Sequence, residues 1–317
     1  MNKKNQPYIL VFGASVVDIF GFCSSCYKPY NSTPGNIKIS FGGVCRNIAE
    51  NMARVGVNTK FISILGDDSK GRSMMEHSKV IGYDMSESLV LENEGTPTYM
   101  AILNENGEMV SGIADMKVID KMDFDFIDSK EEIINNSEYI CLDADDPEKL
   151  EYILNKFKGK TRFILDPISA AKAENIKHLI NKFHTIKPNR HEAEILAGFK
   201  IKNDEDLKKA GVYFLSLGIE NVFISLDADG IYYCNKSECG RIKANDVEVN
   251  NVTGAGDSFV AGLGYGYMNN MSMEEMVKFS IAMSIITISH EETINPRMSK
   301  ELVQKVIKNT NWEKIQL

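Results

Sequence analysis

Short apolar runs alternate with amphipathic segments along most of the chain, and this alternation restricts the folds that the chain can adopt. The apolar runs lie at residues 8–13, 60–65, 139–142, 162–165, 185–186 and 221–225. Segments with helical spacing lie between them, at residues 71–81, 147–157, 173–183 and 204–217. Continuous apolar strands separated by helices are typical of a parallel sheet that is covered on both faces. The sequence therefore predicts an α/β fold.

Two other parts of the chain depart from this alternation. The C-terminal third is predicted to be mostly helical, at residues 256–268, 273–289 and 299–309. Residues 20–41 and 96–113 instead contain short β-type pieces with turns and no helix between them, and Asn106-Gly107 is a hairpin signal. A small additional β structure is therefore expected beside the main sheet.

A turn of small residues at positions 251–256 runs directly into an apolar helix that carries Asp257 in its first turn. Backbone N–H groups at a helix start lack intrahelical partners, and the helix dipole adds partial positive charge there. Gly254 and Gly256 allow the backbone to come close to a phosphate. Asp257 would repel a phosphate that was merely bound, but it could take the proton of a hydroxyl that attacks the phosphate. The turn is thus interpreted as a phosphoryl-transfer site. The alternative is an ordinary helix start in which Asp257 only stabilises the dipole.

A second glycine turn, Gly42-Gly43, opens an earlier helix. Apolar residues recur at helical spacing after it: Val44, Ile48, Met52 and Val55. Asn47 falls one turn inside this helix, and its amide can both donate and accept hydrogen bonds. Such a group suits the vicinal hydroxyls of a sugar. Taken alone, the same pattern also fits a helix cap followed by a surface amide.

Polar side chains follow several of the predicted strands. Asp18 comes after the first strand, and later strands are followed by Asp143, Asp166 and Asn189. In open α/β sheets the active site forms at the carboxyl ends of the strands, so these side chains are expected to converge on one edge. Asp166-Pro167 equally fits a strand-ending turn, and Asp166 is not expected to contact substrate.

Three motifs in a fixed order resemble those of the ribokinase-like (PfkB) family of carbohydrate kinases. Gly42-Gly43 with Asn47 matches the family's sugar-binding motif, residues 188–192 match its Asn-x-x-Glu magnesium motif, and residues 253–257 match its catalytic motif. The resemblance extends from Ile9 to about Lys308. It implies a three-layer ribokinase-like fold with a mostly parallel central sheet flanked by helices. It also implies a single domain over residues 1–317, with a β lid formed by residues of about 20–41 and 96–113, and a homodimer formed through this lid.

The resemblance further implies a role for each motif residue. Asp257 would be the catalytic base, and charge on the transferring group would be stabilised by the N–H groups of Gly254, Ala255 and Gly256. The residues that would hold the sugar are Asp18, Gly42, Gly43 and Asn47. ATP and Mg²⁺ would be the cofactors, with the nucleotide side formed by Asn189, Lys187, Ser225 and Gly230. The metal would be oriented through water by Asn189 and Glu192.

Two of these roles have simpler alternatives. Glu192 could only add negative charge at the start of a helix. Lys187 could meet phosphate oxygens or only a nearby carboxylate. Both alternatives remain open at the level of the sequence.

The sequence also departs from the family pattern at three places. Val16 stands where family members usually carry an asparagine, and Asn251 stands where they often carry an aspartate that helps to bind a monovalent cation. Activation by potassium is therefore in doubt. In the nucleotide-side turn at residues 225–230, only the second glycine of the family motif, Gly230, is kept. Asp227 would repel ATP phosphates, so this loop is expected to turn outward.

Composition and charge restrict the partners and the compartment. The 317 residues carry a net charge of −8 with no basic run, which argues against nucleic acid as a partner. No stretch reaches transmembrane length, and the apolar run after residues 1–7 is too short for a signal peptide, so a cytosolic protein without membrane contact is expected. Cys23 and Cys26 have redox or zinc spacing but lack a second ligand pair. The six cysteines are expected to be free thiols.

Together these features predict an ATP-dependent kinase that phosphorylates the 5′-hydroxyl of a ribosyl compound. Within the same fold, the alternatives are a kinase of another nucleoside or of a free sugar such as ribose. A non-catalytic nucleoside or sugar sensor is the alternative from another class, but a sensor would not need Asp257. A nicotinamide-dependent oxidoreductase is disfavoured because the chain has no Gly-x-Gly-x-x-Gly turn after its first strand.

Overall fold

The structure is a computed structural model that describes residues 6–317, and its centre is a sheet of nine strands in the order β15-β14-β13-β12-β11-β10-β9-β1-β4. The parallel part comprises β1 (Ile9–Phe12), β4 (Thr59–Ile62), β9 (Tyr139–Asp143), β10 (Arg162–Asp166), β11 (Thr185–Ile186) and β12 (Asn221–Ser225). One edge is completed by antiparallel strands, β13 (Ile231–Cys234), β14 (Cys239–Ala244) and β15 (Trp312–Gln316). The predicted mostly parallel sheet is confirmed.

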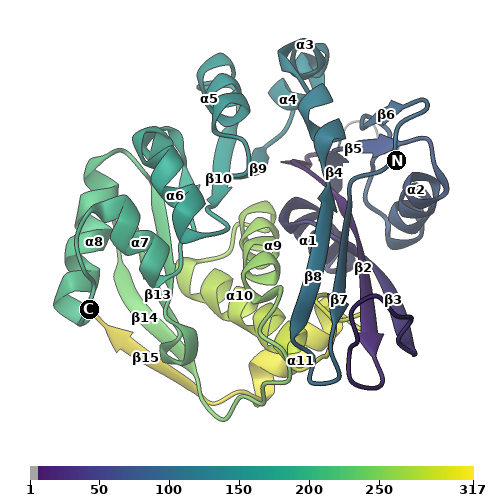
Figure 1. The fold of residues 1–317 in the computed structure, drawn as a ribbon. Coiled ribbons are helices and arrows are strands. Elements are labelled where there is room, and N and C mark those ends of the chain that lie inside the picture. Colours follow the sequence, from purple (N-terminus) through teal and green to yellow (C-terminus); the bar gives the residue numbers. More distant parts are fainter. Residues whose placement is uncertain (1–5) are drawn as a thin grey trace.

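Helices cover both faces of this sheet, which gives the three layers visible in Figure 1. One face is covered by the 3₁₀ segment η2 (Lys117–Lys121), α3 (Phe124–Ser129), α4 (Glu131–Asn135), α5 (Pro147–Lys156), α6 (Ala170–Ile176), α7 (Arg190–Ala197) and α8 (Asp204–Ser216). The other face is covered by α1 (Val44–Arg54), α2 (Ser69–Ile81), α9 (Ala255–Met268), α10 (Met273–Ile288) and α11 (Lys300–Asn309). Side chains alternate along each strand, so in β1 Leu10 packs into the first layer while Val11 packs into the second.

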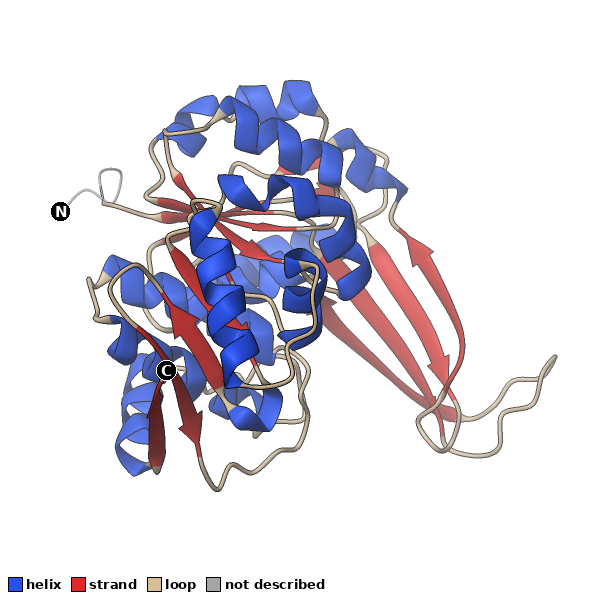
Figure 2. Cartoon of the chain, turned by 90° about the vertical axis from the view of Figure 1, so that its left-hand side faces the viewer, coloured by secondary structure: helices blue, strands red, loops and turns tan. Residues whose placement is uncertain are grey.

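The second β structure is a four-stranded sheet that projects from the body, as Figure 2 shows. It contains the two segments that were predicted to form a lid, and it is called the lid from here on. Its order is β3-β2-β7-β8, with β2 (Val16–Cys23), β3 (Gly35–Gly42), β7 (Thr98–Leu103) and β8 (Met109–Asp115). The two predicted lid segments therefore do pair, through β2 and β7. The lid begins earlier than predicted, because β2 starts at Val16. Asp18 is consequently a lid residue and not a residue at the edge of the main sheet.

Several predicted elements differ from the observed ones. The strand expected at 60–65 is divided between β4 and β5 (Ile64–Gly66), and β5 pairs with β6 (Leu89–Leu91) in a separate small sheet. The helix expected at 173–183 is divided between α6 and the 3₁₀ segment η3 (Lys177–Lys182). Strands β13 to β15 were not predicted.

The expectation of free thiols is wrong for one cysteine pair. Cys234 and Cys239 form a disulfide, because the pairing of β13 with β14 places these two residues opposite each other. Cys23, Cys26, Cys45 and Cys141 are free, as expected. Cys23 and Cys26 lie on the lid strand β2 and just after it.

Among the described residues, no helix combines the length and the apolar character needed to cross a membrane. Residues 1–5 belong to the segment considered above for a signal peptide, and they lie outside the described residues.

Candidate active site

The turn before α9 has the geometry of an anion site. Gly254 is the N-cap residue and has a φ of 82°, and a Cβ atom at this position would collide with the carbonyl oxygen of Thr293. Only glycine fits such a position without strain. No side chain caps the helix, so N–H groups of its first turn can serve an anion. The N–H of Ala255 makes a long hydrogen bond of 3.4 Å to Val252, within the turn itself.

Asp257 lies in this first turn and is buried, with only 8% of its surface exposed. Burial and the charge of Asp166 raise the pKa of Asp257 to about 7, against the lowering effects of a hydrogen bond from Asn47 and the charges of Lys187 and Arg46. A carboxyl group that ionises near neutral pH is suited to accept a proton in catalysis.

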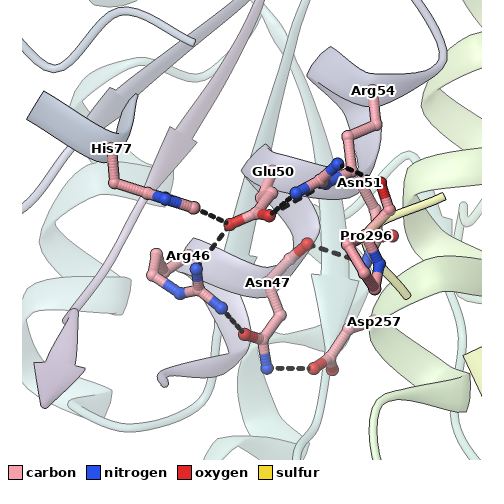
Figure 3. A network of polar contacts seen from close by, with 8 residues as sticks. All are labelled: Arg46, Asn47, Glu50, Asn51, Arg54, His77, Asp257 and Pro296. Carbon is pink, nitrogen blue, oxygen red and sulfur yellow. Dashed lines mark hydrogen bonds and ion pairs between the residues drawn. The ribbon is translucent and has the colours of Figure 1, made fainter. Parts of the chain in front are cut away.

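Close packing of α1 against α9 brings Asn47 to Asp257. Gly264 of α9 has no side chain, and a Cβ atom there would collide with the Cε of Met52 on α1. The two helices can therefore approach closely, and the Nδ2 of Asn47 donates a hydrogen bond of 2.7 Å to the Oδ2 of Asp257 (Figure 3). Asn47 follows the N-cap residue of α1, Gly43, by one turn.

Asn47 is a buried site residue, which excludes the surface-amide alternative. Its Oδ1 accepts a hydrogen bond of 2.6 Å from the guanidinium of Arg46, so both ends of the amide already have protein partners. The second hydrogen on Nδ2 remains available to a ligand. Arg46 was not singled out from the sequence, although it lies inside the sugar-binding motif.

Asp18 reaches the same region from the lid. It is half-buried on β2, and Gly42 at the end of β3 borders its carboxylate. Burial raises the pKa of Asp18, and the charge of Arg46 opposes this shift. The predicted sugar-binding residues of the lid and of α1 therefore do come together, around Arg46.

Lys187 follows β11 and is buried, with its Nζ 3.2 Å from the Oδ2 of Asp166. Burial alone would lower the pKa of Lys187, but the carboxylates of Asp166, Glu192 and Asp257 outweigh it and raise this pKa. The Nζ also lies next to Gly256 at the start of α9. Lys187 thus has a carboxylate partner and, at the same time, a position from which it can meet a phosphate.

Asp166 was predicted not to contact substrate, yet it lines the same cavity as Asp257 and acts on its pKa. It ends β10, in register with Asp143 at the end of the neighbouring strand β9. Asp143 accepts a hydrogen bond from the Sγ of Cys45 on α1. The position of Asp166 at the end of a strand was the sequence signal for a place in the site. This signal was discounted because Asp166-Pro167 also fits a strand-ending turn.

Asn189 and Glu192 form a capping box at the start of α7. The Oδ1 of Asn189 accepts from the N–H of Glu192 at 2.9 Å, and the Oε2 of Glu192 accepts from the N–H of Asn189 at 2.8 Å. Burial raises the pKa of Glu192, and the N–H of Asn189 and the charge of Lys187 oppose this shift. The helix-start alternative is therefore real, but both residues also line the cavity.

The donor set of this cavity fits a magnesium ion held through water. The described residues contain no cluster of three or more His, Cys, Asp or Glu side chains that could bind a metal directly. Mg²⁺ keeps several waters and needs few protein ligands, and carboxylate oxygens are its preferred protein ligands. Glu192 and Asp166 provide such oxygens to the cavity.

A cavity of about 1100 Å³ is bordered by Asp257, Lys187, Asp166, Asn189 and Glu192. The predicted sugar-binding residues Asp18, Gly42, Gly43 and Asn47 are not part of its lining. Its lining includes polar or small residues, Lys187, Asn189, Glu192, Ser225, Gly230 and Asp257, and apolar residues, Val249, Val252, Ile281, Ile285 and Ile288. The loop that contains Asp227, Ala228 and Gly230 lines the cavity too, so the expectation that it turns outward is wrong. A cavity of this size, with apolar lining residues and with the uncapped start of α9 at its border, has room for a nucleotide.

Asn251 stands where related kinases often carry a cation-binding aspartate, and here its side-chain amide makes two hydrogen bonds. Its Oδ1 accepts from the N–H of Thr253 at 3.0 Å, and its Nδ2 donates to the carbonyl of Glu291 at 3.0 Å. The side chain therefore stabilises the turn that leads into α9.

The profile of the pfkB family carbohydrate kinases matches residues 6–300. The pseudouridine kinase of Escherichia coli (strain K12) is 32% identical over 308 residues, which cover 96% of this chain and 98% of that enzyme. A crystal structure from Clostridium perfringens, provisionally described as a sugar kinase, is 66% identical with a TM-score of 0.97 and covers 99% of both chains. The Arabidopsis thaliana ribokinase, solved in complex with ribose and ATP, is 22% identical with a TM-score of 0.79, over 95% of this chain and 99% of that one.

Proposed function

The chain belongs to the PfkB family of carbohydrate kinases, and we propose that it transfers the γ-phosphoryl group of ATP to the 5′-hydroxyl of pseudouridine. As a member of this family it is a phosphotransferase that acts on a hydroxyl group of a sugar or a nucleoside. The observation that carries the proposed reaction is the placement of Asp257, a buried carboxyl group with a pKa of about 7 at the uncapped start of α9.

The choice of pseudouridine rests on sequence resemblance. Residues 34–38, 43–51, 185–190 and 250–257 resemble the corresponding segments of pseudouridine kinases. The similarity to the Escherichia coli pseudouridine kinase extends over nearly the whole of both chains. Another nucleoside, or a free sugar such as ribose, is the alternative substrate within the same reaction. A non-catalytic sensor is disfavoured, because it would not need a buried carboxyl group with a pKa raised to about 7 at position 257.

In the proposed reaction, Asp18, Gly43 and Asn47 hold the ribose, and the carboxylate of Asp257 orients the 5′-hydroxyl and accepts its proton. Charge that spreads over the transferring group is stabilised by the first-turn N–H groups of α9 and by the ammonium of Lys187. The ATP donor occupies the cavity of about 1100 Å³. Closure of the lid keeps out water, which would otherwise compete as the phosphoryl acceptor.

Mg²⁺ would be held through water by Asn189 and Glu192, with Asp166 close by, and would supply positive charge beside the phosphate oxygens. Because Asn251 offers no carboxylate, and its amide is already bound to the N–H of Thr253 and the carbonyl of Glu291, little activation by potassium is expected. A cytoplasmic location follows from the proposed use of ATP.

A panel of nucleosides and sugars tests the proposed substrate, with ADP release from ATP as the measurement. Pseudouridine is expected to give a kcat/KM far above that of free ribose, since contacts to the base add binding energy that is realised on lid closure. A higher kcat/KM for ribose would overturn the substrate but leave the kinase reaction standing. Binding of a nucleoside without ADP release from any compound would favour the sensor instead.

One face of the lid has the apolar character expected of a dimer interface. This face carries exposed apolar side chains on three strands: Ile37 and Ile39 on β3, Met100 and Ile102 on β7, and Ile113 on β8. The register aligns Ile39, Ile19, Met100 and Ile113 in one row across the sheet. Contiguous exposed apolar surface marks interaction sites. We infer that residues 1–317 form a single kinase domain that dimerises with a second copy through this lid face.

Lysine substitutions on the lid face test this dimer. The double variant Ile39→Lys/Ile113→Lys is expected to sediment as a monomer where the wild type sediments as a dimer, because two buried lysines would face the partner. The matched control is Val80→Lys on α2, a residue that is 82% exposed and lies outside the lid. A wild-type protein that sediments as a monomer at micromolar concentration would contradict the inference.

A further inference from the structure

Arg46 is a buried arginine, with 3% of its surface exposed, in the first turn of α1. Arginine is almost never buried to this extent unless its charge is paired. Its Nη1 donates to the Oε2 of Glu50 at 2.6 Å, and its Nη2 donates to the Oδ1 of Asn47 at 2.6 Å. Figure 3 shows the guanidinium between these two side chains, with Asp257 on the far side of Asn47. Arg46 thus connects an ion-pair cluster to the amide that contacts the catalytic carboxylate.

The contact with Arg46 fixes the Asn47 amide from the end that faces away from Asp257. A guanidinium can only donate hydrogen bonds, whereas an amide has one accepting end and one donating end. With Oδ1 bound to Arg46, Nδ2 must point to the Oδ2 of Asp257. In the flipped amide, two donors would face each other at Arg46, and two acceptors would face each other at the carboxylate. Arg46 therefore favours the same amide orientation as the carboxylate of Asp257 does, and it holds Asn47 in place from the other end.

Arg46 is itself held firmly by the cluster behind it. The carboxylate of Glu50 is 2% exposed and also binds Arg54, at 2.7 and 2.9 Å, and His77, at 2.9 Å. The Nη1 of Arg54 also donates a hydrogen bond of 2.8 Å to the carbonyl of Pro296. Burial alone would raise the pKa of Glu50, but the hydrogen bond from His77 and the charges of Arg46 and Arg54 outweigh it and lower this pKa to about 2. Glu50 therefore stays ionised and anchors Arg46.

The charge of Arg46 also acts on the two carboxyl groups that the proposed reaction uses. It opposes the effect of burial on the pKa of Asp257 and on that of Asp18. The other charged groups that act on Asp257 are Asp166 at the end of β10, which raises its pKa, and Lys187 after β11, which lowers it. Removing Arg46 would thus leave Asp257 protonated over a wider pH range.

We propose that Arg46 is a positioning residue of the phosphoryl transfer, which orients the Asn47 amide and, through it, the carboxylate of Asp257. This inference rests on the proposed role of Asp257 as the base. It does not depend on which nucleoside or sugar is the substrate, because neither contact involves the substrate.

The test compares Arg46→Met with Arg54→Met, using ATP and pseudouridine, or the substrate that the panel selects. Arg46→Met should lower kcat by about 10- to 100-fold, since misplacement of a reacting group by about 1 Å can cost that much. The acidic limb of its kcat–pH profile should move to higher pH, while the KM for ATP stays unchanged. Arg54→Met also removes a guanidinium from the carboxylate of Glu50, but Arg54 does not contact Asn47. This control variant should therefore have a lower melting temperature, with kcat and the acidic limb unchanged.

Arg46→Lys provides a second readout in case Arg46→Met does not fold. Lysine keeps the positive charge but lacks the fork that reaches Glu50 and Asn47 together. It should keep the acidic limb near its wild-type position while kcat still falls. A kcat and an acidic limb unchanged in both Arg46 variants, or changed equally in Arg54→Met, would overturn the inference. If Asp257→Asn leaves turnover intact, the assignment of Asp257 as the base fails. The proposed function fails only if the wild-type enzyme releases no ADP with any compound of the panel, so its failure is distinguished from that of the Arg46 inference.

Discussion

Replacement of Asp257 by asparagine is expected to lower turnover by a factor of about 10² to 10⁴, the usual range for loss of a general base. The amide keeps the size of the carboxyl group, and its oxygen can still accept the hydrogen bond from the Nδ2 of Asn47. It cannot accept the proton of the attacking hydroxyl. Steady-state ADP release measures the effect, and turnover within a few-fold of wild type would contradict the assignment of the base.

The stability of this variant provides its folding control. The pKa of Asp257 is raised in the native state, so its contribution to stability is fully present below the unfolded pKa and is lost as the pH rises through about 7. Asparagine carries no charge, so Asp257→Asn should gain stability relative to wild type on going from pH 4 to pH 8. Thermal unfolding at the two pH values tests this sign. In the wild-type enzyme, the same ionisation should make kcat rise with pH through about 7.

Replacement of Lys187 by methionine is expected to impair both folding and turnover. It leaves the buried carboxylate of Asp166 without its partner at 3.2 Å, and breaking such a pair typically costs about 3–5 kcal/mol of unfolding free energy. If Lys187 also meets the phosphate in the transition state, kcat should fall by a further factor of about 10² to 10³. Denaturant unfolding and ADP release measure the two effects separately.

The double variant Asp166→Asn/Lys187→Met separates the two roles of Lys187. Removing both charges eliminates the unpaired carboxylate, so most of the lost stability should return. Turnover should remain low if Lys187 stabilises charge on the transferring group. Recovery of near wild-type turnover in the double variant would show instead that Lys187 only neutralises Asp166, as the simpler alternative holds.

Much of the fold followed from local patterns. The apolar runs and the helices between them predicted the parallel sheet, because a strand that is buried on both faces must be apolar on both. The antiparallel edge was missed, since β13 and β14 meet through a hairpin and β15 comes from the far end of the chain. The disulfide was missed for the same reason: the spacing of Cys234 and Cys239 does not reveal that a hairpin places them opposite each other.

The candidate site divides in a similar way. Residues within one turn or helix start were identified from the sequence, as with Asp257 behind its two glycines and with the pair Asn189 and Glu192. Asp166 was not assigned to the site, because a strand end followed by proline does not reveal that Lys187 and Asp257 lie nearby. Lys187 was left with two alternatives, and its neighbours Asp166 and Gly256 show that both are geometrically possible.

The sequence by itself determined the chemistry that each segment can perform: an anion cradle with a carboxylate at the start of α9, and a donor–acceptor amide at the start of α1. Those properties are local, since they depend on backbone freedom and on helix ends. Only the tertiary structure decided that the two segments form one site, 210 residues apart in sequence. The close approach of α1 to α9 at Gly264 joins Asn47 to Asp257, and burial there raises the pKa of the carboxyl group to about 7. Desolvation and neighbouring charge arise from packing between distant segments, which no local pattern contains.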